Sequence, residues 1–178
     1  VEVPKIIYAT IEFVDIAGLV KGASQGEGLG NQFLGNIRDT DAIVHVVRGF
    51  DDPNVVHVSG EINPQEDIEI ITIELALADL AQLERKIVKL ESEIKGDRKL
   101  IPTFELAQSL QDHLALGKPV LTHPERDSAV FIELTREMRF LTAKPVIFAV
   151  NVDEAGLASE TPEVAAVREI AAKTGAEV

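Results

Sequence analysis

An acidic residue followed by a glycine-rich stretch offers the clearest chemistry in this 178-residue sequence. The apolar run 6–14 ends at Asp15, and Gly18 follows three residues later. Buried parallel strands deliver carboxylates to the carboxyl edge of a sheet, where α/β proteins bind ligands. There Asp15 could hold Mg²⁺ through water, and the Gly18 N–H could approach a terminal phosphate without a Cβ in the way. With four further glycines in 22–30, the segment predicts a nucleotide switch. Ordinary turn chemistry is the alternative.

A second polar segment, Asn151-Val152-Asp153-Glu154, follows the apolar run 145–150. Proteins that bind guanine nucleotides carry an Asn-Lys-x-Asp element here, and its Asp reads the base. In this chain Asn151 is kept, Val152 replaces the Lys and Glu154 stands at the Asp position. The extra methylene moves the carboxylate by about 1.5 Å, which a bidentate contact with guanine tolerates poorly. A turn that caps the next segment is the alternative interpretation.

Of the four histidines, His57 lies in a predicted loop after the apolar run 42–47. Its imidazole could orient or deprotonate a water if that loop closed on a nucleotide, although most loop histidines are simply solvated. His45 lies inside the apolar run, so we expect it to be packed or hydrogen-bonded. His113 and His123 have no interpretable context in the sequence.

The elements that must position these residues alternate between strands and helices. The runs 6–14, 42–47 and 145–150 are short and rich in β-branched residues, as in strands buried on both faces. Helical spacing predicts a helix over 28–39, and a capping threonine, a first-position proline and a final glycine mark another over 162–173. This order is typical of a doubly wound α/β domain with a parallel sheet.

The middle of the chain has a different pattern, with apolar residues at alternating intervals of three and four and charged residues between them. This pattern predicts a coiled-coil seam, made by Ile73, Ala76, Leu80, Leu83, Ile87, Leu90 and Ile94. Gly96-Asp97 interrupts it, and a second apolar stripe begins at Phe104. We therefore expect an antiparallel helical hairpin, followed by another helix over 125–140.

Residues 73–142 are accordingly interpreted as an all-helical insertion between 1–72 and 143–178, the two parts of one nucleotide-binding domain. Basic residues crowd one end of the hairpin: Arg85, Lys86, Lys89, Lys95, Arg98 and Lys99. Interspersed acidic residues favour a solvated, salt-bridged face. Contact with RNA at the basic tip, 95–99, is the alternative.

Composition excludes several classes of protein. The formal charge of −13 argues against binding nucleic acid by bulk electrostatics. The absence of Cys excludes disulfides and thiolate metal sites, and it fits a reducing cytosol. No apolar run is long enough to cross a bilayer. Because the sequence starts at Val1 with strand character and ends with the opening of another strand, we expect a fragment of a longer protein.

Together these motifs support a resemblance to a known family. The stretch FVDIAGLVKGASQGEGLGNQFLGNIRDTDAIVHVVRGF closely resembles the YchF/Ola1 family of Obg-like translation-factor nucleotide hydrolases. The likeness continues through DDPNVVHVSGEINPQEDIEII, IELALADL, LTAKPV, NVDE and VREIAAKTGAEV. It is weakest over about 83–140. The resemblance implies a P-loop nucleotide-binding domain, α/β with a three-layer parallel sheet, which carries a helical coiled-coil insertion and precedes a TGS domain.

The resemblance also implies roles for individual residues. Asp15 and Gly18 match the element that senses Mg²⁺ and the γ-phosphate. Leu19 occupies the position where many GTPases have the Gln that orients the attacking water, and His57 matches the histidine proposed to replace it. Asn151 and Glu154, with Val152 between them, match an altered base-reading motif associated with preference for ATP over GTP.

The sequence also departs from the family. The phosphate-binding motif G-x-x-x-x-G-K-[ST] is not in these residues, and Gly49 stands where the family commonly has Cys. The main hypothesis is a cytoplasmic, monomeric ATP/GTP hydrolase that uses Mg²⁺ and binds the ribosome or ribosomal RNA through its coiled coil. The fragment alone should be inactive. The alternative is a nucleotide-gated interaction module in which hydrolysis is incidental.

Overall fold

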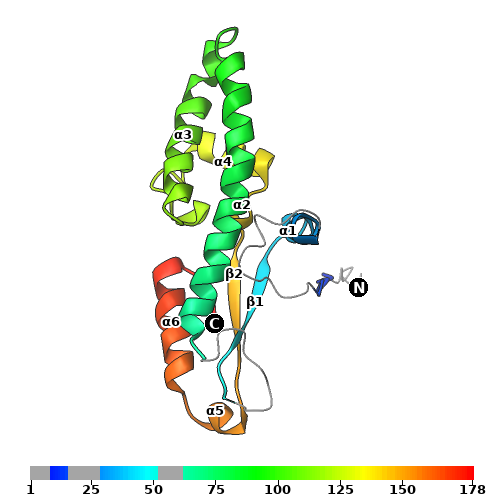
Figure 1. Cartoon of the computed structure of the whole chain (residues 1–178), viewed down its shortest axis with the longest axis vertical. Helices are drawn as coiled ribbons and strands as arrows, with labels where there is room; N and C mark the ends of the chain where they lie inside the picture. The colour runs from blue at the N-terminus through cyan, green and yellow to red at the C-terminus, as the bar shows by residue number, and fades with distance from the viewer. Residues whose placement is uncertain (1–8, 16–28, 52–61) are drawn as a thin grey trace, which may run out of the picture.

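The computed structural model describes residues 9–15, 29–51 and 62–178 of the chain. The molecule is elongated: a small parallel sheet with its covering helices forms one end, and a helical hairpin projects from it (Figure 1). Among the described residues, no helix is both long enough and apolar enough to cross a membrane.

The sheet confirms two of the predicted strands. β1 (Ile43–Arg48) and β2 (Val146–Asn151) pair in parallel, with Ile43 opposite Val146 and Arg48 opposite Asn151. Near the end of the chain, Glu177 forms a further parallel bridge to Ile147. This isolated bridge lies where the sequence suggested the opening of another strand, but the described sheet itself has two strands.

The strand predicted over 6–14 is not formed in its described part. Residues 9–15 belong to no helix or strand, and Ile11 and Phe13 are about four-fifths exposed, at 79% and 80%. A strand is stable only when neighbours satisfy its backbone groups and bury its side chains. Within the described residues β1 pairs with β2 and with no segment on its other side, so the apolar pattern of 9–14 has no partner strand there.

Helices cover one face of this sheet. α6 (Pro162–Thr174) and the first turns of α2 (Pro64–Glu93) pack on it, and the shared core consists of Val47, Ile68, Phe148, Val167 and Ala171. The ends of α6 match the sequence prediction: the side chain of Thr161 accepts a hydrogen bond from the Val164 N–H, and Gly175 adopts the left-handed conformation.

α2 is one continuous helix of 30 residues that serves both ends of the molecule. It begins at Pro64, where Asn63 caps it. Three apolar clusters lie along it in order. Ile68 belongs to the sheet core, Leu75 packs with α1 (Leu29–Arg38) and Leu141, and the residues from Ala76 to Leu90 pack into the hairpin.

The hairpin has the predicted antiparallel form, and its turn falls at Gly96-Asp97. The short η2 (Arg98–Leu100) leads into α3 (Ile101–Ala115), whose buried residues lie against α2. η3 (Val120–Thr122), α4 (Ala129–Met138) and η4 (Leu141–Ala143) return the chain to β2. α4 is shorter than the predicted 125–140 because Ser128 caps its start and Arg139, with φ of 49°, ends it.

Candidate functional site

The carboxyl edge of the parallel sheet brings together the ends of β1 and β2. Arg48 and Asn151 are partners in the last register position, and the Gly49 N–H donates to the Asn151 carbonyl at 2.8 Å. The Arg48 guanidinium lies 5.0 Å from the centroid of the Phe50 ring. Parallel sheets bind ligands at this edge, so the geometry places the base-reading candidates where such a ligand would lie.

The segment after β2 has a defined turn. The Asp153 carboxylate accepts a hydrogen bond from the Gly156 N–H at 2.8 Å, which caps the five-residue α5 (Glu154–Ala158). The turn alternative is thus confirmed for Asp153. Asn151 and Glu154 are exposed, and Val152 is half-buried between them. With Asp153 engaged in the cap, Glu154 offers the available carboxylate of this segment.

Two glycines allow the backbone to pack tightly at this edge. A Cβ on Gly49 would lie 2.6 Å from the Cγ1 of Val150, and a Cβ on Gly156 would lie 2.8 Å from the Cβ of Val152. Real Cβ atoms do not approach other atoms so closely. Any side chain in place of Gly49 would therefore require Val150 to move.

Of the other predicted site residues, Asp15 is the one that the structure describes, and it is not at this edge. Asp15 lies in the exposed segment 9–15, which Figure 1 shows apart from α5. Gly18 and His57 fall outside the described residues. Within 9–15, 29–51 and 62–178, no group of three or more acidic or histidine side chains could hold a metal. The exposed carboxylate of Asp15 still fits Mg²⁺. This ion commonly takes one or two protein carboxylates and completes its shell with water and substrate phosphates.

An apolar cleft of about 460 Å³ lies elsewhere, between α2, the end of α3 and α6. Its walls include Ile68, Leu114 and Ile170, with Glu69 as its acidic member. Of the residues predicted to bind nucleotide, those that the structure describes (Asp15, Asn151, Val152 and Glu154) do not line this cleft. The cavity and the predicted site are therefore separate features.

His45 is packed, as predicted. Its ring contacts that of Phe148, with centroids 5.7 Å apart, and burial lowers the pKa of its imidazole, although Asp67 acts in the opposite direction. His45 is therefore a half-buried packing residue of β1.

His123 is buried beneath α3 and is also neutral. Its Nδ1 accepts from the Glu125 N–H at 3.2 Å, so its Nε2 carries the proton and donates to the Ser109 hydroxyl at 3.0 Å. Burial, and then the nearby His113, lower the pKa of His123. Because Nε2 is already protonated, His123 cannot act as a base toward Ser109. This pair is a structural contact and not a catalytic dyad.

A buried acidic residue is the largest polar feature that the sequence did not predict. The Asp79 side chain is fully buried in α2 and accepts three hydrogen bonds of 2.8 Å, from the N–H groups of Leu141 and Thr142 and from the Thr142 hydroxyl. The hydroxyl in turn accepts from the Val120 N–H at 3.0 Å. The signal was present in the spacing, since Asp79 follows the seam residue Ala76 by three positions and therefore lies on the buried stripe.

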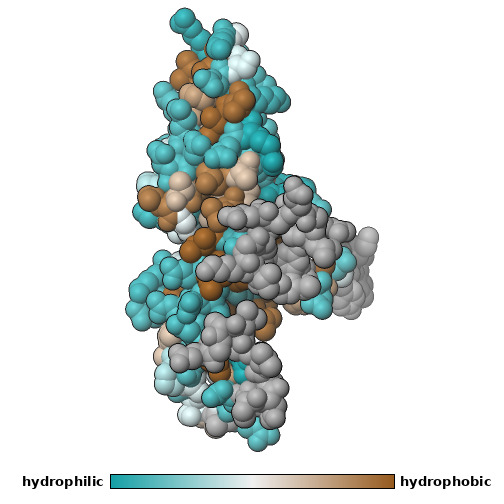
Figure 2. Space-filling view, in the orientation of Figure 1, coloured by the Kyte–Doolittle hydropathy of each residue, from teal (hydrophilic) through white to brown (hydrophobic). Residues whose placement is uncertain are grey.

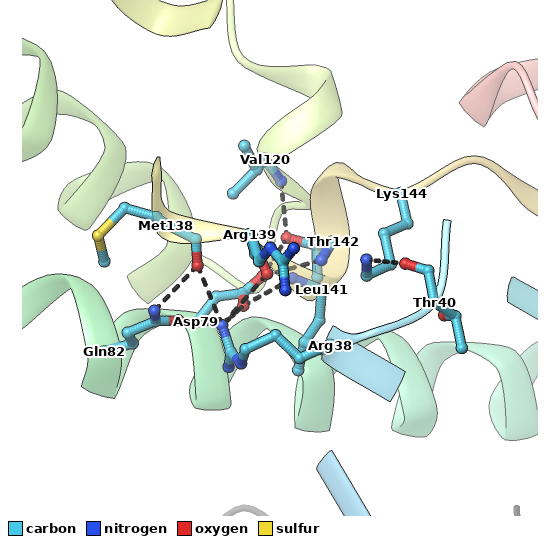
Figure 3. A network of polar contacts seen from close by, with 10 residues as sticks. All are labelled: Arg38, Thr40, Asp79, Gln82, Val120, Met138, Arg139, Leu141, Thr142 and Lys144. Carbon is cyan, nitrogen blue, oxygen red and sulfur yellow. Dashed lines mark hydrogen bonds and ion pairs between the residues drawn. The ribbon is translucent and has the colours of Figure 1, made fainter. Parts of the chain in front are cut away.

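Arg38, the last residue of α1, meets this network (Figure 3). Its guanidinium lies 3.8 Å from the Asp79 carboxylate, and it donates to the Gln82 side chain and to the carbonyls of Met138, at 3.4 Å, and Arg139, at 3.3 Å. Burial raises the pKa of Asp79, against the effect of its hydrogen bonds, and lowers the pKa of Arg38. Both directions show that loss of hydration is the largest electrostatic effect at this junction.

Comparison with known proteins gives the family. The model described as "50S ribosome-binding GTPase" matches residues 3–99, just over half of the chain. The chain belongs to this family. The matched range contains the acidic and glycine-rich segment, β1 and all of α2. Family membership therefore rests on the region in which the sequence predicted a nucleotide switch.

Relatives within the family carry the name YchF, and the resemblance drawn from the sequence is confirmed. The chain is 47% identical over 173 residues to the "Ribosome-binding ATPase YchF" of Escherichia coli O157:H7, covering 95% of this chain and 46% of the relative. It is 42% identical over 181 residues to the protein of the same name in Bacillus subtilis strain 168, covering 98% and 48%. The chain thus spans about half the length of these relatives.

A solved structure agrees with these relatives. The YchF GTPase of Schizosaccharomyces pombe superposes with a TM-score of 0.69 at 32% identity, covering 91% of this chain and 45% of that one. The match supports an α/β nucleotide-hydrolase fold whose parallel sheet and helices are those described above.

Proposed function

We propose that this chain is part of a YchF-type nucleotide hydrolase that binds the ribosome and hydrolyses ATP in preference to GTP with Mg²⁺. The observation that carries the nucleotide preference is the turn after β2. Because the Asp153 carboxylate is engaged by the Gly156 N–H, it does not serve as a guanine reader one position early. Glu154 is left at that position, exposed and one methylene longer than the usual Asp.

The preference can be tested by competition between ATP and GTP, in a form of the protein that includes the phosphate-binding loop absent from these 178 residues. ATP should displace GTP more readily than the reverse. Shortening the carboxylate in Glu154→Asp should raise the share of GTP bound, whereas Glu160→Asp, an exposed residue paired with Arg168, should change nothing. A clear preference of the parent protein for GTP would refute the proposal.

The proposed chemistry is in-line attack of water on the γ-phosphate. Mg²⁺, when bound, neutralises phosphate charge, and Asp15 would hold it, with Gly18 near the terminal phosphate. Leu19 cannot orient a water, so we assign that role to His57, which lies outside the described residues. His57→Ala should lower turnover and leave nucleotide affinity nearly unchanged. Equal turnover of variant and parent would remove His57 from the mechanism.

We further propose that residues 73–142 are a helical coiled-coil insertion between 1–72 and 143–178. The separate hairpin and sheet cores support this division, and α2 links them. Without a phosphate-binding loop, the 178 residues alone should bind nucleotide weakly, and calorimetric titration with MgATP would measure this.

The hairpin is the proposed contact with the ribosome. Its tip exposes Lys95, Arg98 and Lys99, and Figure 2 shows hydrophilic side chains along the outer edges of this end of the molecule. Because cations that contact RNA phosphates release counterions, neutralising all three should weaken binding to ribosomal particles and flatten its salt dependence. The matched control neutralises Lys118, Arg126 and Lys173, which lie outside the tip.

The alternative function, a nucleotide-gated interaction module, predicts a different pattern. Ribosome binding would then depend on whether ATP is bound and would survive loss of turnover in His57→Ala. If His57→Ala loses both turnover and ribosome binding, hydrolysis is part of the function. We also propose that the protein is cytoplasmic and monomeric. Equilibrium sedimentation would test the monomeric state.

A further inference from the structure

One side chain joins the end of α1 to α2 and to the end of α4. Arg38 reaches Asp79 and Gln82 on α2 and the last carbonyls of α4 at Met138 and Arg139. The labelled residues of Figure 3 show these groups converging on its guanidinium. Arg38 is thus the point at which three segments distant in sequence share one set of polar contacts.

The contacts suit an arginine for physical reasons. The final carbonyls of α4 have no helical donor and carry the negative end of the helix dipole. A guanidinium has five N–H donors in a planar fork, so it can serve these carbonyls and the α2 side chains together. In the two residues after Arg38, Asp39 accepts from Arg139 at 3.1 Å, and the Thr40 carbonyl accepts from Lys144. Polar contacts therefore fix the end of α1 to the segments around it.

We propose that Arg38 is a positioning residue that couples α1 to the helical hairpin. This inference rests on the proposed function, because α1 begins at Leu29, at the end of the glycine-rich segment expected to respond to the γ-phosphate. α1 is a helix of 10 residues, about 15 Å long, and transmits a displacement of its start to its end. The Arg38 guanidinium must then leave some of its present acceptors on α2 and at the end of α4. The Asp79 carboxylate, which accepts from the N–H groups of Leu141 and Thr142, would thereby change its distance from the guanidinium.

The coupling is reciprocal. If bound nucleotide changes the affinity of the hairpin for a partner by some factor, then that partner changes the affinity for nucleotide by the same factor. Lys86 and Glu137, joined at 2.6 Å, also link α2 to α4 but contact neither α1 nor Arg38 in the described structure. This pair therefore provides a matched control.

The test is hydrogen exchange at the amides of Leu141 and Thr142, which Asp79 holds. It uses the full-length protein with its phosphate-binding loop, with and without MgATP, and calorimetry measures nucleotide binding separately. In the parent, MgATP should change protection of these amides by about 5-fold or more, the lower range of typical couplings. In Arg38→Ala the ratio should approach one, and in Lys86→Ala it should match the parent.

Arg38→Lys provides a second variant should the alanine variant fail to fold. It keeps the charge but loses the fork, so its response to MgATP should also shrink. A parent that does not bind MgATP overturns the proposed function and this inference with it. A parent that binds MgATP but shows no change in protection, or Arg38 variants that respond as the parent does, overturns the inference alone.

Discussion

Replacing the buried carboxylate of Asp79 is the sharpest test of how the hairpin is fixed to the rest of the molecule. Asp79→Ala leaves the N–H groups of Leu141 and Thr142, and the Thr142 hydroxyl, without their acceptor. It also leaves the half-buried Arg38 without its anion. Removing one partner of a buried ion pair costs about 3–5 kcal/mol, a large part of the roughly 5–15 kcal/mol that stabilises a typical domain.

Asp79→Asn separates charge from shape. The amide keeps one oxygen as an acceptor. Its NH₂ group replaces the other oxygen and faces an N–H donor of Leu141 or Thr142. At least one N–H of Leu141 or Thr142 is then unsatisfied, at a cost of about 1–3 kcal/mol. We therefore expect Asp79→Asn to destabilise by about 2 kcal/mol and Asp79→Ala by more.

The assay is urea unfolding followed by circular dichroism, provided that each variant unfolds in one cooperative transition. Asp112→Asn is the control, because Asp112 is exposed on α3 and should change stability by less than about 0.5 kcal/mol. If Asp79→Asn unfolds at the same urea concentration as this control, the network contributes little and the reasoning is refuted.

Three further predictions concern the helical region between α2 and α4. Leu83→Ala empties a fully buried position and should cost about 2–5 kcal/mol, whereas Val88→Ala, at a position 69% exposed, should have little effect in the same unfolding assay. Burial holds the pKa of His123 below its ordinary value of 6.5, so the unfolded chain binds the proton more readily and stability is lost as pH falls below about 6.5. Unfolding at several pH values should show this slope, and His123→Gln should flatten it; an unchanged slope contradicts the assignment. Ser128→Ala removes the N-cap of α4 and should cost about 1 kcal/mol, and a thermal midpoint equal to that of the parent would show that the cap is dispensable.

Local signals in the sequence predicted much of the architecture. β-branched runs located β1 and β2, and caps located α6, because strand and helix preferences act over a few neighbouring residues. The apolar stripes predicted the α2–α3 hairpin, since a period near 3.5 places those side chains on one helix face. Asn151 and Glu154 could be placed at the sheet edge from the sequence as well. The predicted strand ends there, and residues that directly follow a strand must lie close to its end.

Pattern alone was a poor guide to the segment 9–14. Its apolar, β-branched run is that of a buried strand, yet a strand exists only when a neighbour pairs with it, and the described sheet supplies none beside it. The length of α4 was likewise set by Ser128 and Arg139 and not by the apolar spacing.

The sequence by itself determined the family and the helical middle region, and it predicted an acidic, glycine-rich switch segment and a base-reading motif with Glu154 in place of Asp. Only the tertiary structure decided how these parts are joined. Arg38, Asp79 and the turn at Leu141 are separated by roughly 40 to 60 residues in the chain, and no local preference relates them. Their junction forms because a buried carboxylate must find donors, and folding brings those donors to α2 from two other segments, the end of α1 and η4.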